Sequence, residues 1–101
     1  MQYNKLVRDK VPEILRKEGL VPVCHNVEGD ELRARLVNKL YEETKEFSDH
    51  WSVEELADLS EVIRALSEII GSSPEQVEWE RCRKAVKKGN FSQGIILEEV
   101  E

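Results

Sequence analysis

The chain has 101 residues, of which 15 are Lys or Arg and 21 are Asp or Glu, giving a formal net charge of −6. This length fits one domain over residues 1–101 and is too short for two ordinary ones. Hydrophobic residues make up 40% and charged residues 36%, a balance typical of a folded, helix-rich protein. The acidic total argues against a nucleic-acid polymer or an anionic membrane as the main partner, because phosphate groups bind clustered Lys and Arg.

Compartment and charge distribution give two further expectations. Without a long apolar run, neither a signal peptide nor a membrane span is expected, and two cysteines are too few for a disulfide framework. These features predict a cytoplasmic protein.

The net charge is +2 over residues 1–27, −10 over residues 28–80 and +2 over residues 81–101. An acidic middle between basic ends is unusual for a simple helical bundle.

The first 29 residues predict a short helix and a strand. Pro12 suits the first turn of a helix that Gly19 ends. The alternation of valines over residues 21–27, between Gly19 and Gly29, then predicts a short strand.

The middle of the chain predicts a hairpin of two long helices. Asp30 is the expected N-cap of a helix that runs to about Ser48. Ser52 and Glu55 fit a capping box for the next helix, which Gly71 ends. The short connection at 49–51 makes the two helices antiparallel.

The last 30 residues predict one more helix and a second strand. Ser73, Pro74 and Gln76 open a helix that ends at Gly89, and its Trp79, Cys82 and Val86 share one face, expected to be core. Residues 94–100 form the second predicted strand, paired with 21–27 because a lone strand is unstable. The predicted fold is therefore mostly α, a helical hairpin or bundle with a small two-stranded β element.

Four carboxylates of the hairpin lie on or beside its apolar faces. At about 100° per residue, Glu43 falls inside the stripe of Leu36 and Phe47, and Glu46 lies at its edge. On the second helix Glu55 points into the apolar arc and Asp58 sits at its border. The antiparallel hairpin predicts that all four acids converge near its loop end.

Converging carboxylates favour a divalent cation, because burying unpaired acids is costly and like charges repel. Oxygen ligands suit Mg²⁺. Three other interpretations of these acids compete with a Mg²⁺ site. A Glu-x-x-Glu pair is common on exposed helices, and Glu55 could serve only as the cap partner of Ser52. A di-iron centre is disfavoured, because neither His25 nor His50 has a Glu three residues earlier.

The acidic motif resembles that of the all-α nucleoside triphosphate pyrophosphohydrolase superfamily, which includes the MazG-like and phosphoribosyl-ATP pyrophosphohydrolase-like proteins. The superfamily signature is Glu-Glu-x-x-Glu, a spacer, then Glu-x-x-Asp. Here it reads Glu42-Glu43-Thr44-Lys45-Glu46 and then Glu55-Leu56-Ala57-Asp58, with a short spacer at 47–54. The stretches 3–12, 84–91 and 95–100 also resemble a compact branch of the superfamily.

The resemblance implies hydrolysis of a nucleoside triphosphate to the monophosphate and pyrophosphate, with Mg²⁺ or Mn²⁺ as cofactor, by a homodimer or dimer of dimers. House-cleaning of non-canonical nucleotides is one expected role. The metal ligands would be Glu43, Glu46, Glu55 and Asp58, and the catalytic acids Glu42 and Glu43. Candidate phosphate-binding residues are basic side chains from both ends of the chain: Lys5, Arg8, Lys84, Lys87 and Lys88. A non-catalytic helical dimerisation or binding module and a phosphoribosyl-ATP pyrophosphohydrolase remain alternatives.

Two expectations concern the base and the oligomer. Trp51, at the hairpin tip beside the acids, is the candidate for stacking on the nucleobase, whereas Phe47 and Trp79 have core-face positions. The apolar stripe of the second long helix is broader than one hairpin can cover. A homodimer that packs these helices would complete the core.

Overall fold

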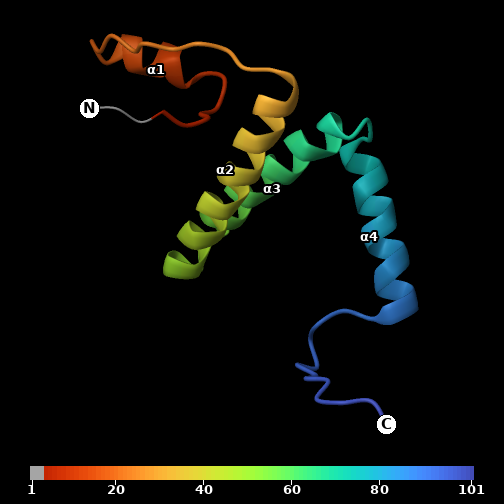
Figure 1. Cartoon of the computed structure of the whole chain (residues 1–101). Helices are drawn as coiled ribbons and strands as arrows, with labels where there is room; N and C mark the ends of the chain where they lie inside the picture. Colours follow the sequence, from red (N-terminus) through yellow and green to blue (C-terminus); the bar gives the residue numbers. More distant parts are fainter. Residues whose placement is uncertain (1–3) are drawn as a thin grey trace.

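The computed structural model describes residues 4–101, and its regular elements are four α-helices. They are α1 (Val11–Lys17), α2 (Gly29–His50), α3 (Val53–Ile69) and α4 (Pro74–Lys88). Figure 1 shows α2 and α3 side by side, with α4 diverging from the far end of α3. The helices have the predicted order and close to the predicted bounds.

Local signals explain most helix ends. Pro12 lies in the first turn of α1, as predicted. Ser73 and Gln76 form a complete capping box at α4, in which the Gln76 amide N donates to Ser73 Oγ at 3.1 Å and the Ser73 amide N donates to Gln76 Oε1 at 3.0 Å. Asp30 is not the N-cap of α2, because Glu28 takes that position and Asp30 lies within the first turn.

The loop end of the hairpin is a tight turn between α2 and α3. Trp51 closes α2 in the left-handed conformation (φ 52°), and its amide N donates to the Phe47 carbonyl at 2.8 Å. Ser52 then caps α3. Only these two residues separate the helices, so the last turns of α2 lie beside the first turns of α3.

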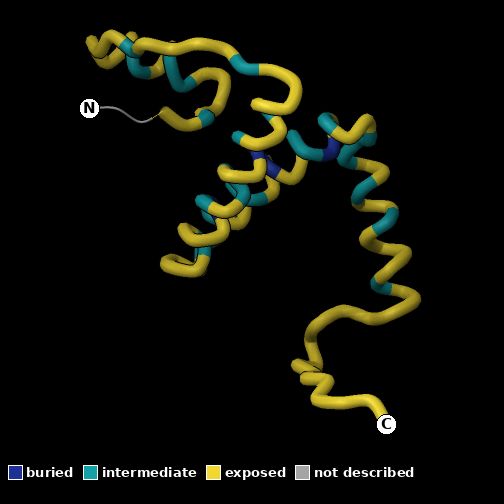
Figure 2. The backbone as a smooth tube through the Cα atoms, in the orientation of Figure 1, coloured by how far each residue is buried: buried dark blue, intermediate teal, exposed yellow. Residues whose placement is uncertain are grey.

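The core is small, and Figure 2 shows its buried positions where α2 and α3 cross and near the junction of α3 with α4. Leu36 and Val62 are its buried apolar residues, and Glu43 and Ser67 are the buried polar ones. Phe47 of the predicted stripe is half-buried, and so are Leu32 and Leu40 of the same helix. The predicted apolar faces thus meet along the hairpin but are only partly covered.

The predicted two-stranded element was wrong, since residues 4–101 contain no strand. The segment 20–28 links α1 to α2 as coil, and residues 89–101 form an irregular tail. Figure 1 shows the two segments on opposite sides of the molecule. A strand needs a partner for its backbone hydrogen bonds, and the course of α4 carries the tail away from residues 20–28.

The expected core face of α4 was also wrong within this chain. Trp79, Cys82 and Val86 share a face, but all three are exposed because α4 diverges from the hairpin. None of the helices in the described part of the chain combines the length and apolar character that a membrane crossing requires.

Candidate functional site

The acids of the two motifs meet at the loop end of the hairpin. Glu43 of α2 and Glu55 and Asp58 of α3 each place a carboxylate oxygen within 4.8 Å of the other two. The spacing of three residues puts Glu55 and Asp58 on one side of α3, and the antiparallel hairpin places them opposite Glu43. The predicted convergence is thus present for three of the four acids in a single cluster.

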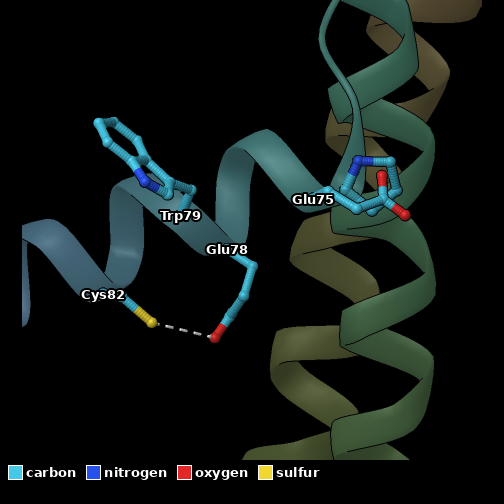
Figure 3. A pocket seen from close by; sticks show the side chains of 5 residues that line it. Glu75, Glu78, Trp79 and Cys82 are labelled. Atoms are coloured by element: carbon cyan, nitrogen blue, oxygen red, sulfur yellow. Dashed lines mark hydrogen bonds between the residues drawn. The ribbon is translucent and has the colours of Figure 1, made fainter.

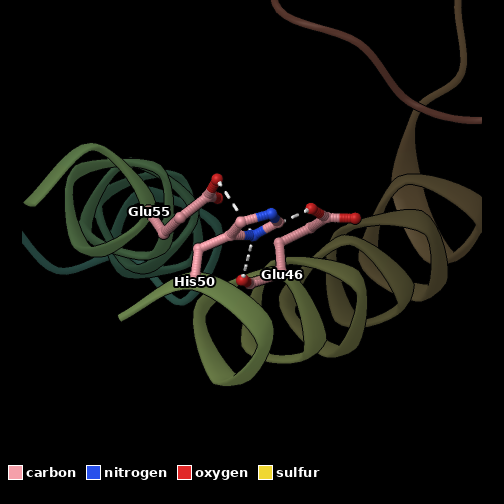
Figure 4. Close-up of side chains that lie close together, drawn as sticks. All are labelled: Glu46, His50 and Glu55. Carbon is pink, nitrogen blue, oxygen red and sulfur yellow. Dashed lines mark hydrogen bonds and ion pairs between the residues drawn. The ribbon is translucent and has the colours of Figure 1, made fainter. Parts of the chain in front are cut away.

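The fourth predicted acid, Glu46, belongs to a second cluster that shares Glu55. Glu46, His50 and Glu55 each offer a ligand atom, and these atoms also lie within 4.8 Å of one another. Figure 4 shows Glu46 and His50 from α2 and Glu55 from α3 pointing toward one another. Glu55 therefore joins two overlapping groups of potential ligands, and all four predicted metal ligands lie in one region.

Glu43 is the most enclosed acid of the site, with 9% of its surface exposed. Its carboxylate lies 3.4 Å from Lys39 Nζ, and the same amine is 3.3 Å from Glu42. The single positive charge of Lys39 is divided between Glu42 and Glu43. It therefore only partly compensates Glu43, which also lies beside the carboxylates of Glu55 and Asp58. Lys39 was not among the predicted site residues, although its place four residues before Glu43 puts both side chains on one helix face.

Glu55 does not act as the reciprocal partner of the Ser52 cap. Its amide N donates to Ser52 Oγ at 3.2 Å, but its carboxylate lies 3.8 Å from His50 Nδ1. Partial desolvation raises the pKa of Glu55, and the nearby carboxylates of the site raise it further. Its side chain thus belongs to the acidic site rather than to the helix cap.

His50 is a site residue that was not predicted from the sequence. It is the last residue of α2, and Nδ1 lies 2.9 Å from the Glu46 carbonyl oxygen and 3.8 Å from one carboxylate oxygen of each of Glu46 and Glu55. The hydrogen bond to the Glu46 carbonyl raises the pKa of His50, and the surrounding carboxylates add to this. The spacing of four residues from Glu46 to His50 places both side chains on one helix face and could have identified His50.

These two raised pKa values predict a pH-dependent stability in the absence of divalent cations. Glu55 and His50 bind a proton more tightly in the folded chain, so their contribution to stability is complete at low pH and is lost as pH rises through the raised pKa values. In EDTA, the wild-type melting temperature should fall more between about pH 5 and about pH 8 than that of Glu55→Gln. Circular dichroism measures this, with Glu68→Gln as control. An equal fall in wild type and Glu55→Gln would contradict the assignment.

Two of the predicted phosphate-binding residues lie against the acids. Lys5 Nζ is 2.8 Å from Glu42 Oε1, and Arg8 Nη2 is 2.7 Å from Asp58 Oδ1. The hydrogen bond from Lys5 lowers the pKa of Glu42, and Lys39 adds to this effect. A low pKa keeps Glu42 ionised but makes it a weak general base while Lys5 stays bound to it.

The other three predicted phosphate-binding residues do not join this site within the chain. Lys84, Lys87 and Lys88 lie in the last turns of α4, far from the loop end of the hairpin (Figure 1). Trp51 does lie next to the site, with its side chain exposed and its ring 4.8 Å from that of Phe47, centroid to centroid. The candidate base-stacking residue is therefore positioned near the acids.

α4 carries a shallow, open depression lined by Pro74, Glu75, Glu78, Trp79 and Cys82 (Figure 3). Arg81 holds the pKa of Glu78 at about 2, so this carboxylate is ionised at any ordinary pH. The Arg81 guanidinium, which could attract an anionic ligand, is already paired with Glu78 at 2.6 and 2.9 Å. The clustered ligands at the hairpin end are therefore the better candidate site.

Comparisons of the chain with protein-family models, with curated proteins and with solved structures found no match in any of the three. The superfamily resemblance therefore stays a prediction from the motif residues.

Proposed function

We propose that the protein is a Mg²⁺-dependent nucleoside triphosphate pyrophosphohydrolase, which cleaves between the α and β phosphates. The observation that supports this most is the meeting of the Glu-x-x-Glu acids of α2 with the Glu-x-x-Asp acids of α3 across one hairpin. Neither motif alone would place more than two carboxylates together.

The donor set fits a hard divalent cation. Glu43, Glu55 and Asp58 supply three carboxylates from two helices, which is the oxygen-rich environment that Mg²⁺ prefers. The same carboxylate oxygens also suit Mn²⁺. A bound cation would offset the repulsion among the acids, neutralise charge on the triphosphate and lower the pKa of an attacking water.

The chain's own side chains would then divide the remaining tasks. Glu43, Glu46, Glu55 and Asp58 hold the cation, and the carboxylate of Glu42 orients the attacking water. Arg8 and Lys5 bind phosphate oxygens, since guanidinium and ammonium groups are the usual protein partners of phosphate. Trp51 stacks on the base, because its ring is exposed and it directly follows His50 of the site.

We further propose that the active form is a homodimer built on α3. The Cα radius of gyration is 17.7 Å, against about 13 Å for a compact chain of 100 residues. Leu56 and Ile63 of α3 and Ile70, the residue that caps its C-terminus, follow one another at intervals of seven residues, and their exposed fractions are 51%, 46% and 70%. Such a repeat is typical of a seam between helices, and a second copy of α3 would cover it.

A dimer would also give a role to the basic end of α4. Because α4 leads away from the acids of its own chain, we propose that Lys84, Lys87 and Lys88 reach the triphosphate of the partner's site. The site would then be built from two chains, with acids from one and part of its positive charge from the other.

Product analysis tests the proposed reaction. Purified protein with Mg²⁺ is incubated with standard and damaged (d)NTPs and with phosphoribosyl-ATP, and the products are separated by ion exchange. Monophosphate and pyrophosphate in equal amounts are expected from at least one nucleoside triphosphate. Turnover of phosphoribosyl-ATP alone would place the activity on that adduct, and no turnover across the panel would favour a non-catalytic helical module.

A further inference from the structure

The segment from residue 4 to residue 10, here called the N-terminal strap, is held against the hairpin at three points. Arg35 Nη1 donates to the Asn4 carbonyl oxygen at 2.7 Å. Lys5 then contacts Glu42 of α2, and Arg8 contacts Asp58 of α3. The strap thus bridges the two helices at the acidic site. The residues of α2 that it contacts are more than 30 positions later in the sequence.

The contact at Asp58 bears directly on the acidic cluster. Asp58 is one of the three residues whose carboxylate oxygens lie within 4.8 Å of one another, and its Oδ1 accepts from Arg8 Nη2 at 2.7 Å. A guanidinium and a divalent cation bound to the same small cluster repel each other, and both are attracted by the same carboxylates. Strap docking and cation binding therefore oppose each other.

We propose that the N-terminal strap is a built-in competitor of the divalent cation. Without a cation, Arg8 neutralises Asp58 and Lys5 neutralises Glu42. Cation binding releases the strap, which frees both basic side chains for the phosphates of the substrate and leaves Glu42, paired then with Lys39 alone, to orient water. This inference rests on the proposed function, because it concerns the regulation of the same site.

The exposure of the contacts makes the exchange feasible. The side chains of the Arg8–Asp58 pair are 55% and 41% exposed, and those of the Lys5–Glu42 pair are 46% and 33% exposed. Ion pairs this exposed contribute little stability, so a cation can displace them. Loss of one pair should change cation affinity by about two- to fivefold.

Calorimetric titration of Mg²⁺ into the full chain tests the competition. Arg8→Gln should bind Mg²⁺ about two- to fivefold more tightly than wild type. Arg35→Gln weakens the anchor of the strap without touching the acids, and it should shift the affinity in the same direction. Arg81→Gln is the matched control, because it removes the same charge from α4, and it should bind as wild type does.

The outcomes separate this inference from the proposed function. If wild type and all variants fail to bind Mg²⁺, the cation site itself is absent and both proposals fall. If wild type binds but Arg8→Gln binds equally or more weakly, the competition is wrong while the cation site stands.

Release of the strap has a second readout that is independent of activity. The amide ¹⁵N{¹H} NOE values of residues 5–9 should fall when wild-type protein is saturated with Mg²⁺, because the strap loses its contacts with Glu42 and Asp58. In Arg8→Gln these values should already be low before Mg²⁺ is added. Unchanged values in wild type at saturation would overturn the release.

Discussion

Glu43→Gln is expected to reduce nucleotide hydrolysis by about a hundredfold or more, while the fold persists. Glu43 is the most buried of the clustered acids. Water therefore has the least access to this position and can least take over its role as a ligand. The amide keeps the shape of the side chain but removes its charge. Lys39 is not left without a partner, because Glu42 lies 3.3 Å from its amine. Initial rates with a hydrolysed nucleotide and Mg²⁺ measure the effect.

The controls for Glu43→Gln separate site chemistry from folding. Helical circular dichroism and the melting temperature in EDTA should equal or exceed the wild-type values, because one of several repelling charges is gone. Glu68→Gln removes an exposed carboxylate from the other end of α3 and should retain full activity. Wild-type rates in Glu43→Gln would refute the assignment of this residue to the metal.

Ile63→Asp is expected to convert the proposed dimer to a monomer. Ile63 is the middle residue of the exposed stripe formed with Leu56 and Ile70. A carboxylate at the centre of an apolar seam would be desolvated without a partner, at a cost of several kcal/mol, so the dimer should weaken by at least about a hundredfold. Sedimentation equilibrium should show wild type at twice the chain mass of 11.7 kDa and the variant at the chain mass.

The matched control for the stripe is Val23→Asp. Val23 is even more exposed but lies in the coil between α1 and α2, so this substitution adds the same charge away from α3. It should leave the dimer intact. A wild-type chain that sediments at 11.7 kDa at micromolar concentration and retains activity would contradict the dimer.

Local signals were sufficient to predict the helices. The capping residues Ser52 and Ser73, Pro12 in the first turn of α1 and the apolar repeats of α2 and α3 act within a few residues. The antiparallel hairpin followed from the short connection alone. Because the convergence of Glu43, Glu55 and Asp58 depends only on helix phase and this hairpin, it too could be predicted.

Features that depend on long-range placement could not be predicted in the same way. The valines at 21–27 and the apolar tail have the alternation of strands, but whether they pair depends on where α4 leads the chain. The same is true of Trp79, whose apolar face is uncovered in the single chain. A hydrophobic pattern indicates that a face favours burial, but it does not identify what buries it.

Among the ion pairs of the site, the local ones could be predicted from the sequence and the long-range ones could not. Glu46 with His50 and Lys39 with Glu43 are four residues apart, so helix geometry alone could have found both pairs. Arg8 with Asp58 joins residues 50 positions apart. The basic character of the strap was visible in the sequence, but the particular acid that each side chain contacts was not.

The most direct test of the cation site at the hairpin end is a Mn²⁺ titration followed by electron paramagnetic resonance. Free aqueous Mn²⁺ gives a six-line spectrum that weakens when the ion is bound by protein. Wild-type protein and Glu68→Gln should remove this signal in a saturable manner, and Glu43→Gln should do so with at least about tenfold lower affinity. Undiminished free Mn²⁺ in the presence of wild-type protein, or equal binding by Glu43→Gln, would contradict a cation site built from these acids.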